Sequence, residues 1–113
     1  MIRIDALWLC AAPVDMRSGT ERLLAHVIMT LGAARAHHGY LFCNARASRI
    51  KLVVHDGFGV WCAARRLNAG GFVWVTKTGE TPAALQLTRQ QFDALVVGLP
   101  WQRLPEMQVI CRA

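Results

Sequence analysis

The fold of this chain is decided by the stretch Gly39-Tyr-Leu-Phe-Cys-Asn-Ala-Arg-Ala-Ser-Arg-Ile-Lys-Leu-Val-Val-His-Asp-Gly57. An apolar run over residues 40–43 stops at a polar turn over residues 44–48, and an alternating run over residues 50–55 follows. The second run ends in Asp56-Gly57, a dipeptide typical of a tight hairpin turn. The stretch therefore predicts two paired antiparallel strands followed by a second hairpin.

The second of these strands has two unlike faces. Successive side chains on a strand point to opposite sides, so Arg49, Lys51, Val53 and His55 share one face. The even-numbered residues between them are aliphatic and form the other face. We therefore expect a half-buried ribbon with a cationic outer surface, which favours binding over catalysis.

Upstream, the pattern predicts a short buried strand over residues 6–10, ended by Pro13. A helix follows over residues 19–31, where leucine, valine and isoleucine recur at helical spacing. Ser18 and Glu21 match a capping box at the start of this helix. Gly32 is a suitable residue to end it.

Downstream, residues 60–66 predict a third strand of the ribbon, although a short helix is an alternative because alanine and arginine are good helix formers. Residues 72–76 predict a fourth strand, and residues 77–83 an exposed loop. Thr88 and Gln91 form a second capping box, which starts a helix that Gly98 and Pro100 end. The tail over residues 108–111 could add an edge strand.

Together these elements predict one domain over residues 1–113, because this length can bury a single core. The fold class is α+β. We expect an antiparallel sheet of four to five strands, connected as a meander of hairpins, with both helices packed on its apolar face. The opposite face would carry the arginines.

The composition favours a polyanionic partner. The chain has 13 Lys and Arg against 7 Asp and Glu, a formal net charge of +6, and such a balance attracts nucleic acid or anionic surfaces. The guanidinium of arginine binds phosphate through paired hydrogen bonds. The candidate nucleic-acid-binding residues are Arg46, Arg49, Lys51, Arg65 and Arg66. The alternative is a solvated sheet face whose arginines serve solubility.

The sequence offers no recognisable catalytic motif, neither a G-x-S-x-G elbow nor a P-loop. Asp5, Asp15 and Asp56 could converge as a metal-dependent nuclease site, but their spacing does not indicate it. No catalytic residue, metal ligand or cofactor is therefore predicted. Four separated cysteines indicate a reduced cytoplasmic protein, and DNA binding would associate it with the nucleoid. No apolar run is long enough to cross a membrane.

The order and spacing of several short motifs resemble one family across nearly the whole chain. They are Pro13-Val14-Asp15-Met16-Arg17 with Gly19, Leu41-Phe42 with Asn44, Arg46, Arg49, Ile50 and Lys51, Asp56-Gly57-Phe58-Gly59, Arg66-Leu67, Gly70 with Phe72 and Trp74, and Leu95 with Gly98-Leu99 and Trp101. The family is that of the accessory proteins, labelled TnpB, from the second reading frame of IS66 insertion sequences of bacteria. One departure is Val75, where relatives commonly have proline.

The resemblance implies a role in DNA transposition, beside a larger DDE-type transposase and a small helix-turn-helix protein of the same element. It supplies no agreed catalytic residues. The first hypothesis is a non-catalytic accessory factor that binds DNA at the element ends through the basic hairpin. The second is an adaptor that bridges the two other proteins without touching DNA, and the third is the nuclease. A homo-oligomer formed through exposed tryptophan is a further expectation.

Overall fold

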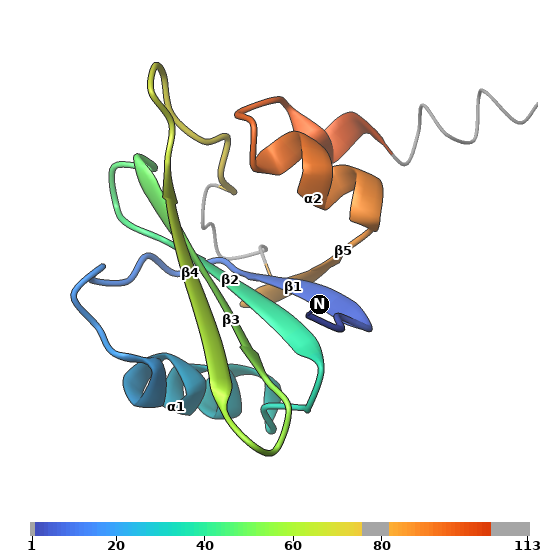
Figure 1. Cartoon of the computed structure of the whole chain (residues 1–113). Helices are drawn as coiled ribbons and strands as arrows, with labels where there is room; N and C mark the ends of the chain where they lie inside the picture. The colour runs from blue at the N-terminus through green and yellow to red at the C-terminus, as the bar shows by residue number, and fades with distance from the viewer. Residues whose placement is uncertain (1, 76–81, 105–113) are drawn as a thin grey trace, which may run out of the picture.

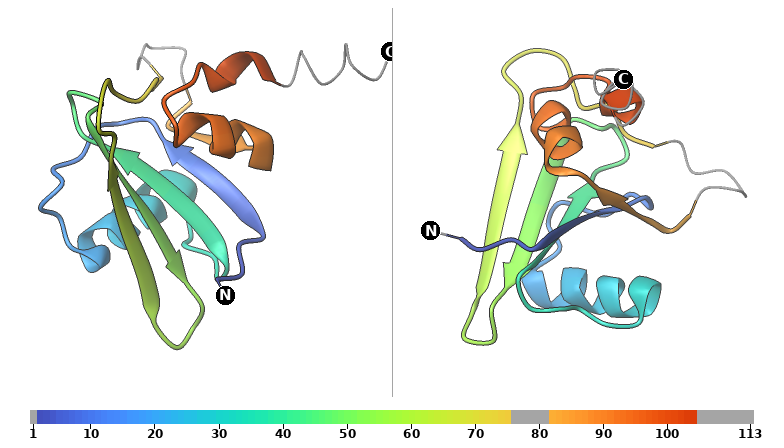
Figure 2. Two further views of the ribbon diagram at one scale, coloured as in Figure 1. Left: turned by 45° about the horizontal axis from the view of Figure 1, so that its top comes forward. Right: turned by 90° about the vertical axis from the view of Figure 1, so that its right-hand side faces the viewer.

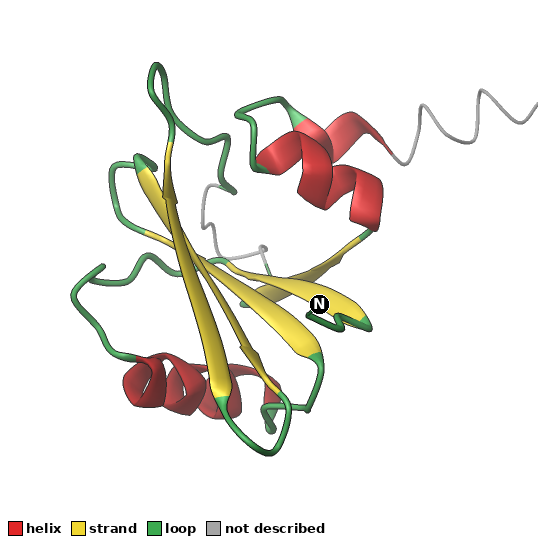
Figure 3. Ribbon diagram, in the orientation of Figure 1, coloured by secondary structure: helices red, strands yellow, loops and turns green. Residues whose placement is uncertain are grey.

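The computed structural model describes residues 2–75 and 82–104. Its centre is a five-stranded sheet (Figure 1). In chain order, the elements are β1 (Ala6–Cys10), α1 (Thr20–Leu31), β2 (His38–Cys43), β3 (Arg49–His55), β4 (Val60–Arg66), β5 (Ala84–Leu87), α2 (Arg89–Leu95) and the 3-10 helix η1 (Trp101–Arg103). Strands and helices are both well represented (Figure 3), so the α+β class is confirmed.

The strand order across the sheet is β4-β3-β2-β1-β5. The pairs β2–β3 and β3–β4 are antiparallel, as predicted for the runs over residues 40–43, 50–55 and 60–66. The pair β1–β5 is also antiparallel. The pair β1–β2 is parallel, which corrects the expected all-antiparallel meander. The reason is that α1 lies between these strands and returns the chain to the end of the sheet from which β1 started.

The two helices pack on opposite faces of the sheet, and not on one face as the sequence predicted. Leu23 and Val27 of α1 cluster with Tyr40 and Phe42. Leu95 of α2 clusters instead with Leu41 and Cys43, whose side chains point to the opposite face of β2. Because residues 39–43 of β2 are all buried, this strand needs cover on both sides, which one layer of helices cannot give.

The predicted fourth strand is absent from residues 72–75, and the rest of its predicted range lies outside the described residues. This segment packs beside α2 without pairing as a strand. Trp101 Nε1 donates to Val73 O at 2.7 Å, and the Phe72 amide donates to Ala47 O at 2.8 Å. The strand that pairs with β1 is instead β5, which the sequence pattern did not predict. The tail over residues 108–111 also lies outside the described residues.

The ends of the helices follow the sequence in part. The capping box of Thr88 and Gln91 is formed at α2, and Gly32 ends α1 with φ of 87°. The predicted box at Ser18 is wrong, because Gly19 is the N-cap of α1 and no side chain caps it. Ser18 is buried, and its carbonyl accepts a hydrogen bond from Lys51 Nζ at 3.1 Å. The chain before α1 is thus held by the sheet.

Gly98 follows α2 and lies close to Leu67 and Gly71. We expect Gly98→Ala to lower the free energy of unfolding of the domain by about 1–3 kcal/mol. The φ of Gly98 is 85°, and an added Cβ would lie 3.0 Å from Leu67 Cδ1 and 3.1 Å from Gly71 O. Urea unfolding measures the change. The control is Gly59→Ala, whose Cβ would meet nothing within 4 Å. Equal unfolding midpoints for both variants would contradict the prediction.

Candidate nucleic-acid interface

Two adjoining hollows lie at the end of the sheet where β2 ends and β3 begins. The first, of about 900 Å³, lies between the loop over residues 14–17 and the turn over residues 44–49. The second, of about 480 Å³, lies between Met16, the start of β3 and residues 64–66 at the end of β4. Met16 and Arg49 line both, so we treat the two as one basic groove. Its charged lining residues are Arg17, Arg46, Arg49, Lys51, Arg65, Arg66 and Asp15.

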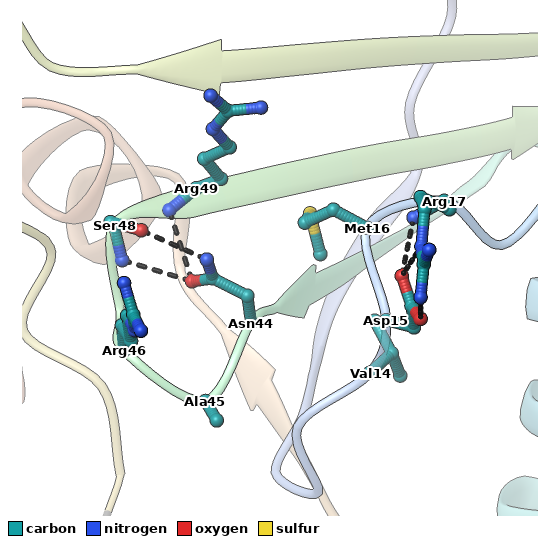
Figure 4. Close-up of a pocket in the computed structure, with 9 residues that line it drawn as sticks. All are labelled: Val14, Asp15, Met16, Arg17, Asn44, Ala45, Arg46, Ser48 and Arg49. Atoms are coloured by element: carbon teal, nitrogen blue, oxygen red, sulfur yellow. Dashed lines mark hydrogen bonds and ion pairs between the residues drawn. The ribbon is translucent and has the colours of Figure 1, made fainter.

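Asn44 fixes the shape of the turn that carries the first arginines of the groove. Its Oδ1 accepts hydrogen bonds from the backbone amides of Ser48 at 2.9 Å and Arg49 at 3.1 Å. Its Nδ2 donates to Ser48 Oγ at 2.8 Å, so the side chain ties the turn together (Figure 4). Ala47 takes a positive φ of 55°, which costs a residue other than glycine some strain. The Asn44 bonds hold this conformation.

We therefore expect Asn44→Ala to lower the free energy of unfolding by about 1–3 kcal/mol, because the bonded amides of the turn lose their acceptor. Chemical unfolding followed by tryptophan fluorescence measures it. Asn44→Asp is the matched control, since its carboxylate keeps an acceptor for both amides and loses only the donor. An equal loss in the two variants would show that the bonds to the backbone amides do not hold the turn.

Arg49 and Arg66 face each other across the strands. They are directly opposite in the β3–β4 register, and both are exposed. Like charges directly opposite on a sheet repel each other, so this pair is unfavourable unless an anion lies near it. Arg46 is also exposed, on the adjacent turn, and in Figure 4 Arg46 and Arg49 lie across the hollow from the Asp15–Arg17 pair. The arrangement suits a phosphate-bearing ligand.

Lys51 and Arg65 are placed differently from the expectation of one free cationic surface. Lys51 shares the face of Arg49 but is half-buried, with its ammonium on Ser18 O. Arg65 pairs with Ile50, so its side chain belongs to the α2 face. Its Nε donates to Val96 O at 2.7 Å, at the end of α2. The predicted set is therefore split between the two faces, and the α1 side of this sheet end holds Arg49, Lys51 and Arg66.

Among the described residues, Arg46, Arg49 and Arg66 of the basic groove have no carboxylate partner, whereas Arg17 is paired with Asp15. Hydrogen bonds from Arg17 lower the pKa of Asp15 to about 2, so this acid is ionised and already engaged at neutral pH. Within residues 2–75 and 82–104, the ion pairs are Arg3–Asp5, Arg17–Asp15 and Arg89–Asp93. None of them includes Arg46, Arg49 or Arg66. No carboxylate of the described residues therefore neutralises the positive charge of these three side chains.

The three carboxylates of the nuclease hypothesis are engaged separately. Asp5 is bonded to Arg3, Asp15 to Arg17, and Asp56 accepts from the amides of its own hairpin turn. In the described part of the chain, no group of three or more His, Cys, Asp or Glu residues is arranged to hold a metal ion. The structure thus does not bring these acids together.

The cysteines of the described residues differ in burial. Cys10 and Cys43 are buried, and burial raises the pKa of their thiols to about 12 and about 11. Cys62 is exposed on β4. Trp61 on the same strand is 54% exposed.

None of the described helices has the length and apolar character that a membrane crossing requires.

The loop over residues 14–17 is the part of the groove that the charge pattern did not reveal. Val14 N donates to Cys43 O at 2.9 Å, which sets the loop beside the end of β2. Met16 then reaches both hollows. The available signal was the motif Pro13-Val14-Asp15-Met16-Arg17, which had no interpretation from local patterns alone.

The sequence profile of the family described as IS66 Orf2 like protein matches residues 5–106, a range that spans every described strand and helix. The chain belongs to the IS66 Orf2-like family. This membership confirms the resemblance and ties the protein to the transposition of insertion sequences.

Two relatives from Sinorhizobium fredii (strain NBRC 101917 / NGR234) are similar to this chain over most of its length. The uncharacterized protein y4jC is 32% identical over 100 residues, covering 86% of this chain and 81% of its own length. The uncharacterized protein y4hO is 26% identical over 102 residues, covering 88% of this chain and 85% of its own. No solved structure matches the chain.

Proposed function

We propose that this protein is a non-catalytic accessory factor that binds DNA at the ends of its insertion sequence, with the basic groove on the phosphate backbone. The observation that carries the proposal is the cluster of Arg46, Arg49 and Arg66, which are exposed, adjacent and unpaired with any described carboxylate. Because the family acts in the transposition of insertion sequences, DNA is the polyanionic ligand that we propose.

The groove suits phosphate contact better than catalysis. A guanidinium group can donate two parallel hydrogen bonds to the oxygens of one phosphate. A phosphate between Arg49 and Arg66 would also relieve the repulsion between their charges. Lys51 adds a fixed positive charge beside them, because its ammonium is held by Ser18 O. Contacts of this kind position a protein on a duplex, whereas sequence preference would have to come from base edges or from DNA shape.

The test is a titration of the purified protein with a terminal-repeat duplex and with a scrambled duplex, each at several salt concentrations. We expect binding to both, with a logarithmic affinity that falls linearly with the logarithm of salt concentration. A tighter complex with the terminal repeat would add recognition of the element ends. Absence of binding to either duplex at low salt would overturn the proposal.

An adaptor role is the second candidate, and one observation favours it. An apolar hollow lies between α1 and the β3–β4 hairpin, lined by Ile28, Phe58 and Val60 among others. Ile28 is 51% exposed and Phe58 fully exposed. Such a patch suits a protein partner, here the DDE-type transposase or the small helix-turn-helix protein of the element. Co-purification that survives nuclease treatment, without duplex binding, would favour the adaptor over the DNA-binding factor.

A further inference from the structure

The outer edge of the sheet is formed by β4, which pairs with β3 on one side only among the described elements (Figure 2). All seven of its residues are exposed, including Val60 at 43% and Trp61 at 54%. The opposite edge strand, β5, has four residues. A long edge with unpaired backbone groups is a template for another strand.

The β4 edge has few of the features by which proteins protect such edges. Its first five residues, Val60 to Ala64, include no charged residue and no proline. Its register with β3 runs without interruption from His55↔Val60 to Arg49↔Arg66, so no bulge turns the edge away. Natural edges of this length are usually blocked by one of these features. Among the described residues, nothing pairs with this edge of β4, so it is open to another strand.

We propose that β4 pairs with β4 of a second copy of this chain, antiparallel and centred on Ala63, so that the two sheets become one. Ala63 is the midpoint of the seven-residue strand, and this register pairs every residue of both strands. A two-fold axis relates the copies, as in most homodimers, and closes the assembly at two chains.

Backbone geometry supports this register. The Asp56 amide donates to Gly59 O at the hairpin end, and hydrogen-bonded pairs alternate with non-bonded pairs along an antiparallel ladder. Counting from that pair, Trp61, Ala63 and Arg65 direct their backbone groups toward β3, whereas Cys62 and Ala64 direct theirs outward. Centring on Ala63 places Cys62 opposite Ala64 of the second copy, so the outward-pointing backbone N–H and C=O groups of the two strands can bond to each other. If the partner strand were shifted by one residue, outward-pointing groups would lie opposite inward-pointing ones.

The side chains favour a second copy in the same antiparallel arrangement. It places Trp61 opposite Arg65 of the second copy, where a guanidinium can lie against the indole. Parallel pairing would instead place each arginine beside its own counterpart. The two-fold axis is perpendicular to the joined sheet, so the basic grooves of both copies face the same side. The dimer itself does not depend on the DNA-binding proposal.

Sedimentation of the full-length protein without DNA, over a range of concentrations, tests the proposal. We expect a monomer–dimer equilibrium, and Cys62→Lys should weaken it at least about tenfold by placing an ammonium at the centre of the edge. Met29→Lys is the control, because it adds the same charge on α1 at a residue that is 87% exposed. A protein that stays monomeric at every concentration, or a dimer unaffected by Cys62→Lys, would overturn the proposal.

Crosslinking tests the register independently. In a chain carrying Cys62→Ser and Cys111→Ser, Ala63→Cys should give a disulfide-linked dimer on mild oxidation, because position 63 faces itself across the axis. Ala64→Cys faces position 62 of the second copy and should remain largely unlinked. Equal linking of the two variants, or linking of Ala64→Cys alone, would overturn the register centred on Ala63.

Discussion

Replacing Arg46, Arg49 and Arg66 together by alanine is expected to weaken binding to duplex DNA by about two orders of magnitude near 0.1 M salt. Each lost phosphate contact should reduce the slope of logarithmic affinity against logarithmic salt concentration by about 0.9, so the triple variant loses about 2.7. Fluorescence anisotropy with the terminal-repeat duplex at several salt concentrations measures both quantities.

The fold should tolerate this triple change. All three side chains are exposed, and the substitution removes the repulsion of Arg49 and Arg66 across the strands. Lys51 is left in place, because its bond to Ser18 O is part of the structure. A free energy of unfolding within about 0.5 kcal/mol of that of the unmodified protein would confirm that any loss of binding is local.

A matched control removes three arginines elsewhere, as Arg3→Ala, Arg35→Ala and Arg89→Ala. These residues are also exposed and do not line the basic groove. The change in net charge is identical, so general attraction to DNA falls equally in both variants. If the control variant loses as much affinity and slope as the groove variant, the groove is not the contact surface.

Phe42→Ala is expected to destabilise the domain by about 3–5 kcal/mol. Phe42 is fully buried between the sheet and α1, in a cluster with Leu23 and Val27. The His26 ring meets it edge-on with centroids 5.9 Å apart. Removal of the ring loses its transfer free energy and leaves a cavity that the paired strands cannot close. Since domains of this size are stable by only about 5–15 kcal/mol, the variant should unfold at much lower urea concentration.

Phe58→Ala is the matched control for Phe42→Ala, because it removes the same ring from an exposed position. Phe58 lies in the β3–β4 hairpin turn and is fully exposed. We expect its unfolding free energy to change by less than about 0.5 kcal/mol. A large loss for Phe58→Ala, or a small one for Phe42→Ala, would contradict the assignment of core and surface in the β2–β3–β4 ribbon.

The ribbon was predictable because its information is local. Alternation over residues 49–55 set the faces of β3, and Asp56-Gly57 set the turn to β4, where Gly57 takes a φ of 88°. The sequence also indicated that Arg49 and Lys51 share a face, and the structure confirms it. Capping by Thr88 and Gln91 was equally local, since it depends on residues three apart.

The errors have a common origin in long-range packing. Ser18 and Glu21 have the spacing of a capping box, but Ser18 is buried beside Lys51 and Gly19 caps the helix instead. The apolar run from Phe72 is strand-like, yet it packs as irregular chain while residues 84–87 pair with β1. Local spacing cannot show which of two apolar segments will reach a free strand edge.

The sequence by itself determined the strands of the ribbon, the extent of α1, the positive charge and the family. Only the tertiary structure decided that the helices lie on opposite faces, that Arg65 belongs to the α2 side, and that Met16 and Arg17 join the groove. The reason is physical: strand faces and turns are set by neighbours within a few residues, whereas the cover of a sheet and the walls of a groove depend on contacts between distant segments.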